Sequence, residues 1–343
     1  MRICLFRLSA IGDVTHALTV VREIQSQSPD AEITWIIGHV EHKLLNGLQG
    51  VEFVEFKKGD GINAWRQLKR TLKGRRFDVL LLMQVAFRAN LTSTLIRADR
   101  RIGYDRERSR DLHGLVIDER IAPGKQQHVI SAMQSFLVPI GLNPVTDPRW
   151  DIPLTDSDYS LADDYLDDSR ETLCISPVSS HRFRNWNVAG YAAAADYAAN
   201  TYDMQVVLMG GNSDFEKEFN RAIEEHMKTA ATNLTGMDTL KQLTAFLGRC
   251  DLVLAPDTGP LHIANAMGTD VIGLHAATNP YRSGAYGQAE RSVNQYPAML
   301  REFLDADVDS VKWGTRIERP GVMDLITVDQ VTEKIDGWAR RKL

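Results

Sequence analysis

Residues 252–268 read LVLAPDTGPLHIANAMG, an apolar strand that leads into Asp257, Thr258, Gly259 and Pro260 and then into a helix of small residues. Pro260 suits the first helical turn, where its missing N–H has no intrahelical acceptor, and Gly259 lets a ligand approach the backbone without meeting a Cβ. Free N–H groups and the positive end of the helix dipole bind anions there, and Thr258 adds a hydroxyl. The stretch predicts a phosphate site, while an ordinary Asp or Thr cap on a packing helix is about equally compatible with it.

A second turn of this kind lies at the start of the chain. The apolar strand 2–8 is followed by Ser9-Ala10-Ile11-Gly12-Asp13 and then by a helix. A strand that begins at residue 2 leaves no room for a signal peptide, and no later stretch has the unbroken apolar length of a membrane span. We therefore expect a cytoplasmic protein.

The composition predicts two domains of opposite charge. The chain has 343 residues, of which 43% are hydrophobic and 25% charged, more than one core usually accommodates. Residues 1–150 carry 22 Lys and Arg against 16 Asp and Glu, whereas residues 151–343 carry 18 against 29. The basic first half predicts an anionic partner rather than general binding to nucleic acid. Cys4, Cys174 and Cys250 lie in or beside apolar strands and are expected to be reduced core residues, and the scattered histidines predict no metal site.

Two basic clusters have different interpretations. In the first, the spacing of Trp65, Leu68 and Leu72 between the charges predicts a solvated helix face. The second has the character of a loop around Gly103 and Tyr104, and it is the better candidate for gripping an anion. The first cluster consists of Lys57, Lys58, Arg66, Lys69, Arg70, Lys73, Arg75 and Arg76, and the second of Arg97, Arg100, Arg101, Arg106, Arg108 and Arg110.

Strands and helices alternate throughout, which predicts an α/β fold of two facing Rossmann-like, doubly wound domains. Strands are expected at 2–8, 32–38, 51–56, 77–83, 173–176, 205–209, 252–255 and 271–275. Helices are expected at 14–27, 62–72, 129–140, 188–200, 215–226, 240–247, 261–267 and 328–340. The linker 143–153, which contains three prolines, separates domains 1–150 and 151–326, and the terminal helix within 327–343 is a candidate to pack back across it.

Ligands of such sheets bind beyond the carboxyl ends of the strands, where both turns lie, so a cleft between facing domains would hold a nucleotide-linked group. The first strand is not followed by the G-x-G-x-x-G loop of dinucleotide dehydrogenases, and the chain has no P-loop. Transfer of a group from a nucleotide carrier is the interpretation that these motifs leave.

The two motifs together, residues 9–16 (SAIGDVTH) and 257–262 (DTGPLH), resemble those of the lipopolysaccharide heptosyltransferases, and the likeness spans nearly the whole chain. The resemblance implies the two-domain type B glycosyltransferase fold. It also implies inverting transfer of heptose from ADP-heptose to the inner core of lipopolysaccharide, without a metal or another cofactor.

The resemblance implies that Asp13, which follows Gly12, is the general base that takes the proton of the acceptor hydroxyl. Thr258, Gly259 and the following amides, with Pro260 in the turn, would hold the diphosphate as charge accumulates on it. The family's lysine before an aromatic helix start corresponds to Arg184, with Arg182 as the competitor. The plainer alternatives are that Asp13 only caps the helix that follows it and that Arg182 lies at the surface.

The remaining candidates follow from position. His262 lies one turn into the helix and would face the diphosphate or serve the packing between helix and strand. Asp257 is expected to fix the turn by bonding nearby amides, and Glu216 is placed to accept ribose hydroxyls. Met237 and Leu240 would border the adenine or belong to the core, and Trp186 is expected to pack in the core. Sugar or acceptor contacts are predicted for Gly12, His16, Arg101, Arg106, Asn279 and Arg282.

The expected partners are the nucleotide sugar and an anionic lipopolysaccharide core, reached by a monomer through transient contact with the inner face of the cytoplasmic membrane. Two alternatives stay open from the sequence. One is a transferase or epimerase for another nucleotide sugar, and the other is a noncatalytic protein that binds nucleotide sugars and does not need Asp13.

Overall fold

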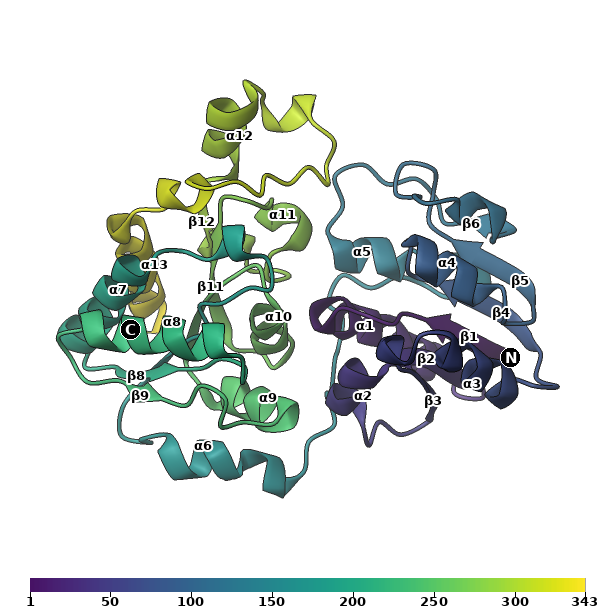
Figure 1. The fold of residues 1–343 in the computed structure, drawn as a ribbon, viewed down its shortest axis with the longest axis horizontal. Coiled ribbons are helices and arrows are strands. Elements are labelled where there is room, and N and C mark those ends of the chain that lie inside the picture. Colours follow the sequence, from purple (N-terminus) through teal and green to yellow (C-terminus); the bar gives the residue numbers. More distant parts are fainter. Residues whose placement is uncertain (343) are drawn as a thin grey trace. The chain divides into compact units, whose positions relative to one another are not determined.

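The structure is a computed structural model that describes residues 1–342. The chain divides into two units, Met1–Pro153 and Leu154–Leu343, each built around one six-stranded parallel sheet (Figure 1). Parallel strands need crossover connections, and helices supply them in both units.

The sheet of the first unit has the strand order β3-β2-β1-β4-β5-β6. Its central strand β1 pairs with β2 on one side and β4 on the other, so that Ile3 lies opposite both Ile33 and Val79. The chain order reverses between β1 and β4, which makes this the switch point of the sheet. The strands are β1 (Arg2–Phe6), β2 (Glu32–Gly38), β3 (Val51–Phe56), β4 (Phe77–Leu82), β5 (Ala98–Gly103) and β6 (Glu119–Arg120), and the helices are α1 (Ile11–Gln27), α2 (His39–Leu45), α3 (Ile62–Thr71), α4 (Phe87–Ser93) and α5 (Val129–Gln134).

Both faces of this sheet are buried, because alternate residues of each strand point to opposite sides. Cys4 and Phe6 belong to a core cluster with Leu68 of α3, while Ile3 and Leu5 are fully buried on the other face. Burying each such side chain contributes about 1.5–3 kcal/mol, so the two-sided burial favours the doubly wound arrangement.

The second unit repeats the same plan with the order β12-β11-β10-β7-β8-β9, and its switch point lies between β7 and β10. Helix α7 packs on α8 and α13, and α10 packs on α9, β10 and β11. The strands are β7 (Thr172–Ile175), β8 (Gln205–Leu208), β9 (Thr232–Asn233), β10 (Leu252–Pro256), β11 (Asp270–His275) and β12 (Val293–Asn294). The helices are α6 (Ser160–Tyr165), α7 (Val188–Tyr202), α8 (Asp214–His226), α9 (Leu240–Arg249), α10 (Gly259–Ala266), α11 (Pro280–Ser283), α12 (Tyr296–Leu304) and α13 (Val328–Lys342).

The predicted doubly wound α/β fold is confirmed, and all eight predicted strands are present within two residues of their expected ends. The second basic cluster required a correction, because residues 98–103 form strand β5 rather than a loop. The three cysteines are free and buried, as expected. Helix α13 packs on α7 and the β11–β12 edge of its own unit, and its return across the linker stays a prediction.

Among residues 1–342, no helix combines the length and the apolar composition needed to span a membrane.

Candidate active site

The switch point of the first unit presents Asp13 at the end of β1. Asp13 is the third residue of α1, and its Oδ2 accepts a hydrogen bond of 3.2 Å from the backbone N–H of Ala10. The guanidinium of Arg7 forms an ion pair with the same carboxylate and also donates to the carbonyl oxygen of Met83, just beyond β4. The side chain of Asp13 is 37% exposed and that of Arg7 only 12%. A carboxylate oriented by a cation and a helix N-terminus, yet open to solvent, is suited to accept a proton from a ligand.

Two further polar side chains join this switch point. The ammonium group of Lys58 donates to the Ser9 hydroxyl, and Gln84, after β4, accepts a bond of 2.9 Å from the N–H of Leu8. The sequence predicted Lys58 in a solvated helix face, but Lys58 precedes α3 and lies just beyond the carboxyl end of β3. Only the pairing of β1 with β4 and the turn after β3 bring Lys58 and Gln84 to Ser9, so no local pattern indicated them.

The other predicted residues of the first unit have mixed outcomes. Gly12 and His16 are buried in α1, and the His16 ring packs edge-on against His128 at 5.9 Å between centroids. The guanidinium of Arg101 donates to the backbone carbonyls of residues 93, 96 and 116 and to one serine hydroxyl. These bonds give Arg101 a structural role and argue against its predicted contact with an acceptor. Arg106 is exposed, and its contact with an acceptor stays a prediction.

The switch point of the second unit contains the helix start predicted from residues 252–268. Thr258 is the N-cap residue of α10, Gly259 is its first residue, and Pro260 lies in the first turn. The Thr258 side chain makes no capping bond, and its hydroxyl is buried without a hydrogen-bond partner in the protein. A buried hydroxyl is normally bonded, so this one is available to a ligand at the helix N-terminus.

Asp257 lies directly below this helix start and is almost completely buried. Its carboxylate accepts a 3.2 Å bond from the Ser283 hydroxyl and lies 3.4 Å from His262 Nε2 and 3.7 Å from Arg184 Nη1. Burial alone would raise the pKa of Asp257, but His262, with the largest lowering effect, and Arg184 bring it well below its usual range. Asp257 therefore stabilises the turn as an anion through side chains, whereas the sequence predicted bonds to nearby amides.

His275, at the end of β11, is fully buried near this carboxylate. Burial lowers its pKa from 6.5 to about 4, against the raising effect of Asp257. It is therefore neutral at pH 7 and adds no positive charge to the site.

The structure separates the two candidate arginines. Arg184 ends a short 3-10 turn after β7, is 7% exposed, and reaches across the switch point to Asp257. Its Nη2 donates a 2.8 Å bond to Glu318, a residue that the sequence analysis did not identify. Arg182 is exposed and lines a pocket of 450 Å³. Trp186 is buried as predicted, and its indole N–H donates to the carbonyl oxygen of Ile326.

The pocket that contains Arg182 also contains Glu216. Glu216 lies in the first turn of α8, where Ser213 donates to Oε2 at 2.6 Å and the N–H of Gly211 donates to Oε1 at 3.0 Å. Phe215 is 45% exposed in the same pocket. A fixed carboxylate beside an exposed aromatic ring suits a ligand with hydroxyl groups and a flat base. Met237 is exposed nearby in sequence, and its predicted contact with adenine is untested.

Asn279 and Arg282 lie after β11. The Asn279 side chain caps α11 by accepting a 3.0 Å bond from the N–H of Tyr281, so its amide has a structural function. Arg282 is half-buried beside Gly314. Their contacts with a sugar stay predictions.

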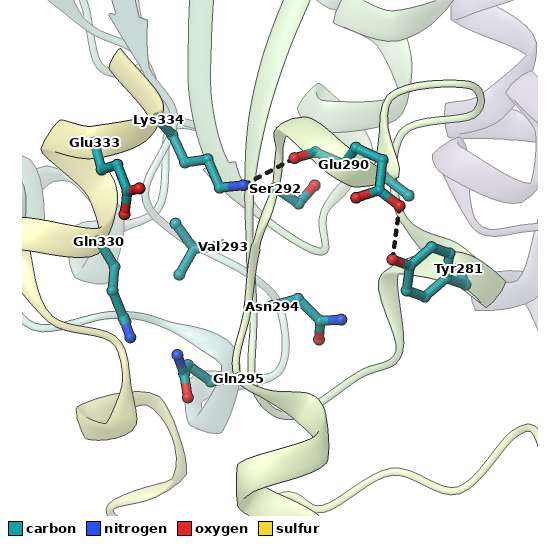
Figure 2. Close-up of a pocket in the computed structure, with 10 residues that line it drawn as sticks. Tyr281, Glu290, Ser292, Val293, Asn294, Gln295, Gln330, Glu333 and Lys334 are labelled. Carbon is teal, nitrogen blue, oxygen red and sulfur yellow. Dashed lines mark hydrogen bonds between the residues drawn. The ribbon is translucent and has the colours of Figure 1, made fainter. Parts of the chain in front are cut away.

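A separate pocket of 240 Å³ lies at the β12 edge of the second sheet (Figure 2). There the Tyr281 hydroxyl donates to the Glu290 carboxylate at 2.8 Å, and Lys334 of α13 donates to the Glu290 carbonyl oxygen at 2.8 Å. None of the predicted site residues lines this pocket, so it is distinct from the two switch-point sites.

The model of glycosyltransferase family 9 (heptosyltransferase) matches residues 65–307 of this chain. The chain is 36% identical over 329 residues to the lipopolysaccharide core heptosyltransferase OpsX of Haemophilus influenzae, which covers 96% of this chain and 94% of that protein.

Solved structures show the same fold. The family 9 glycosyl transferase from Veillonella parvula has a TM-score of 0.81 at 18% identity, over 99% of this chain and 97% of that one. The Escherichia coli heptosyltransferase WaaC with ADP has a TM-score of 0.75 at 17% identity, over 98% of this chain and 100% of that one. The type B fold implied by the sequence is thereby confirmed.

Proposed function

We propose, from the fact that this chain belongs to glycosyltransferase family 9, the heptosyltransferases, that it transfers a heptosyl group from ADP-heptose to the inner core of lipopolysaccharide. The observation that carries this proposal is the 36% identity to a lipopolysaccharide core heptosyltransferase over nearly the full length of both chains. The two switch-point sites then suggest which residues act on each substrate.

Asp13 is the proposed general base. In an inverting transfer, the acceptor hydroxyl oxygen bonds to the anomeric carbon, its proton passes to a carboxylate, and the bond to the diphosphate breaks. The ion pair with Arg7 and the Ala10 N–H orient the Asp13 carboxylate, and its exposed edge leaves room for the acceptor.

The leaving diphosphate is assigned to the start of α10. The amides after Thr258, its unbonded hydroxyl and the Arg184 guanidinium would stabilise the negative charge that accumulates as the glycosidic bond breaks. With these groups in place the proposed transfer needs no metal ion or other cofactor. Glu216 and the 450 Å³ pocket are assigned to the ribose and the base.

We assign the expected membrane contact to a surface of the first unit that we call the α4 patch, formed by Phe87, Leu91, Leu112 and Leu115. These apolar side chains are 41–79% exposed, and a 3.1 Å bond from the N–H of Phe87 to Asp111 ties α4 to the loop that carries the two leucines. Asp111 and Leu112 have φ values of 50° and 65°, a left-handed conformation that costs about 1 kcal/mol per residue outside glycine.

Exposed arginines accompany the α4 patch along the chain, because Arg88 lies in α4, and Arg106 and Arg110 lie in the loop before Leu112. Exposed apolar side chains among cations complement the negatively charged inner leaflet of a membrane, where a lipid-borne acceptor would be found. We propose that the enzyme works there as a monomer.

The test is a transfer assay with purified protein, a panel of nucleotide sugars and truncated lipopolysaccharide cores, read out by product mass. We expect a mass increase of one heptose with ADP-heptose and a core acceptor together. A product formed from donor alone would favour an epimerase, donor binding without product would favour a noncatalytic binder, and transfer from another nucleotide sugar only would overturn the proposed donor.

A further inference from the structure

Arg184 is neutralised more than once in this structure. Its Nη2 donates to Glu318 at 2.8 Å, and its Nη1 lies 3.7 Å from Asp257. Its Nε is buried and has no hydrogen-bond partner in the protein. His275, at the end of β11, is neutral at pH 7 because burial lowers its pKa to about 4, so it adds no positive charge beside Arg184. A guanidinium that already faces two carboxylates offers little net attraction to an incoming diphosphate.

The two carboxylates are held very differently. The side chain of Asp257 is 9% exposed and is bound by Ser283 and His262 within the turn before α10. The side chain of Glu318 is 33% exposed, and it contacts Arg184 and the exposed His181, at 3.4 Å. The Asp257 carboxylate is therefore enclosed by its partners, whereas the Glu318 carboxylate can rotate into solvent.

The backbone beside Glu318 is fixed. The N–H of Ile317 donates a 3.1 Å bond to the carbonyl oxygen of Ala277, and the Ile317 side chain is buried in the core of the second unit. The segment therefore holds Glu318 next to Arg184, and only the end of the glutamate side chain is free to move.

We infer that Glu318 competes with the donor diphosphate: it pairs with Arg184 in the unliganded enzyme and gives way to the phosphates when the donor binds. The inference rests on the proposed function, since it requires Arg184 to contact the diphosphate. In the unliganded enzyme Glu318 is the close counter-charge of the buried guanidinium, since its carboxylate lies 2.8 Å from Arg184 whereas that of Asp257 lies 3.7 Å away.

The test is the affinity for ADP of the wild type and of Glu318→Gln, measured by calorimetry. Removing the competing charge should tighten ADP binding about fivefold, as expected for one charge near a partly exposed pair, and should lower the donor KM without raising kcat. Adenosine, which has no phosphate, should bind both proteins equally. Asp270→Asn is the matched control, because it breaks the ion pair with Arg291 at the opposite end of β11 and should leave ADP binding unchanged.

Equal or weaker ADP binding by Glu318→Gln would overturn the inference and would make Glu318 a residue that positions Arg184. A parallel change in adenosine affinity would also overturn it, because the effect would then not depend on phosphate. If Glu318→Gln folds poorly, Glu318→Ala provides the same comparison. If the wild type binds no ADP, the proposed donor fails together with the inference, whereas ADP binding without the expected tightening refutes only the role of Glu318.

Discussion

Acid should destabilise the first unit through His113. This histidine is 1% exposed, its Nδ1 lies 2.8 Å from the Asn90 amide oxygen, and its Nε2 accepts a bond of 3.1 Å from the N–H of Tyr104. An Nε2 that accepts leaves the proton on Nδ1, which donates to Asn90, so the bond from Tyr104 requires the neutral ring. The network links α4 to the strand β5 and its following loop.

The magnitude follows from the pKa of His113, which burial and then the nearby Arg120 lower from 6.5 to about 4. Between these two values the unfolded chain binds a proton that the folded chain excludes, so stability falls as the pH falls. The contribution of the neutral His113 to the free energy of unfolding is complete above about pH 6.5. It has fallen by about 2 kcal/mol at pH 5 and by about 3 kcal/mol below pH 4.

The measurement is urea unfolding of the wild type and of His113→Gln from pH 7.5 to pH 4, together with an NMR titration of the ring. We expect the variant to be less stable at pH 7 and its deficit to shrink by about 2 kcal/mol at pH 5. His226→Gln, which replaces an exposed histidine at the end of α8, should follow the wild type at every pH. A constant deficit for His113→Gln, or a ring that titrates near pH 6.5, would refute the argument.

Three other substitutions test the proposed site and the α4 patch. Asp13→Asn should lower turnover by about 10²–10⁴-fold without unfolding the protein. The control Asp78→Asn breaks the comparable pair with Arg2 at the other end of the sheet and should leave turnover unchanged. Near-normal turnover of Asp13→Asn would remove Asp13 from the mechanism. Thr258→Val should weaken ADP binding about tenfold without lowering the melting temperature, because it deletes a buried hydroxyl that has no partner, and a loss of stability would show that the hydroxyl is structural. Leu115→Asp should reduce cosedimentation with anionic vesicles, and Leu304→Asp should not; equal binding would place membrane contact elsewhere.

The central strands of both sheets could be predicted because they are fully buried and their sequences are continuous apolar runs. Residues 79–82 of β4 and Leu252–Pro256 are examples in which every residue is apolar and buried, so the pattern indicates a strand covered on both faces. The edge strands β6, β9 and β12 have two residues each, too few to produce a pattern. Strand β5 was missed because its arginines resemble a polar loop, although Arg101 uses its charge to bond backbone carbonyls.

The site was predictable where it depends on local sequence. Asp13, Thr258 and Gly259 all lie where a central strand is followed by a turn and the start of a helix, so a single stretch of chain places each of them. Lys58 and Glu318 could not be found in this way. Each lies outside the α-helices and β-strands, and only the fold brings it to its partner, which is Ser9 for Lys58 and Arg184, 134 residues away, for Glu318.

The repeated strand order gives each half of the chain its own switch point, and the polar contacts that orient Asp13 come from the first unit alone, as those that orient Arg184 come from the second. If the two substrates are divided as proposed, a change in the acceptor recognised by one half need not alter how the other half reads the nucleotide. The choice of donor and the choice of acceptor can then change independently, and exchanging one half between relatives is the direct way to engineer either of them.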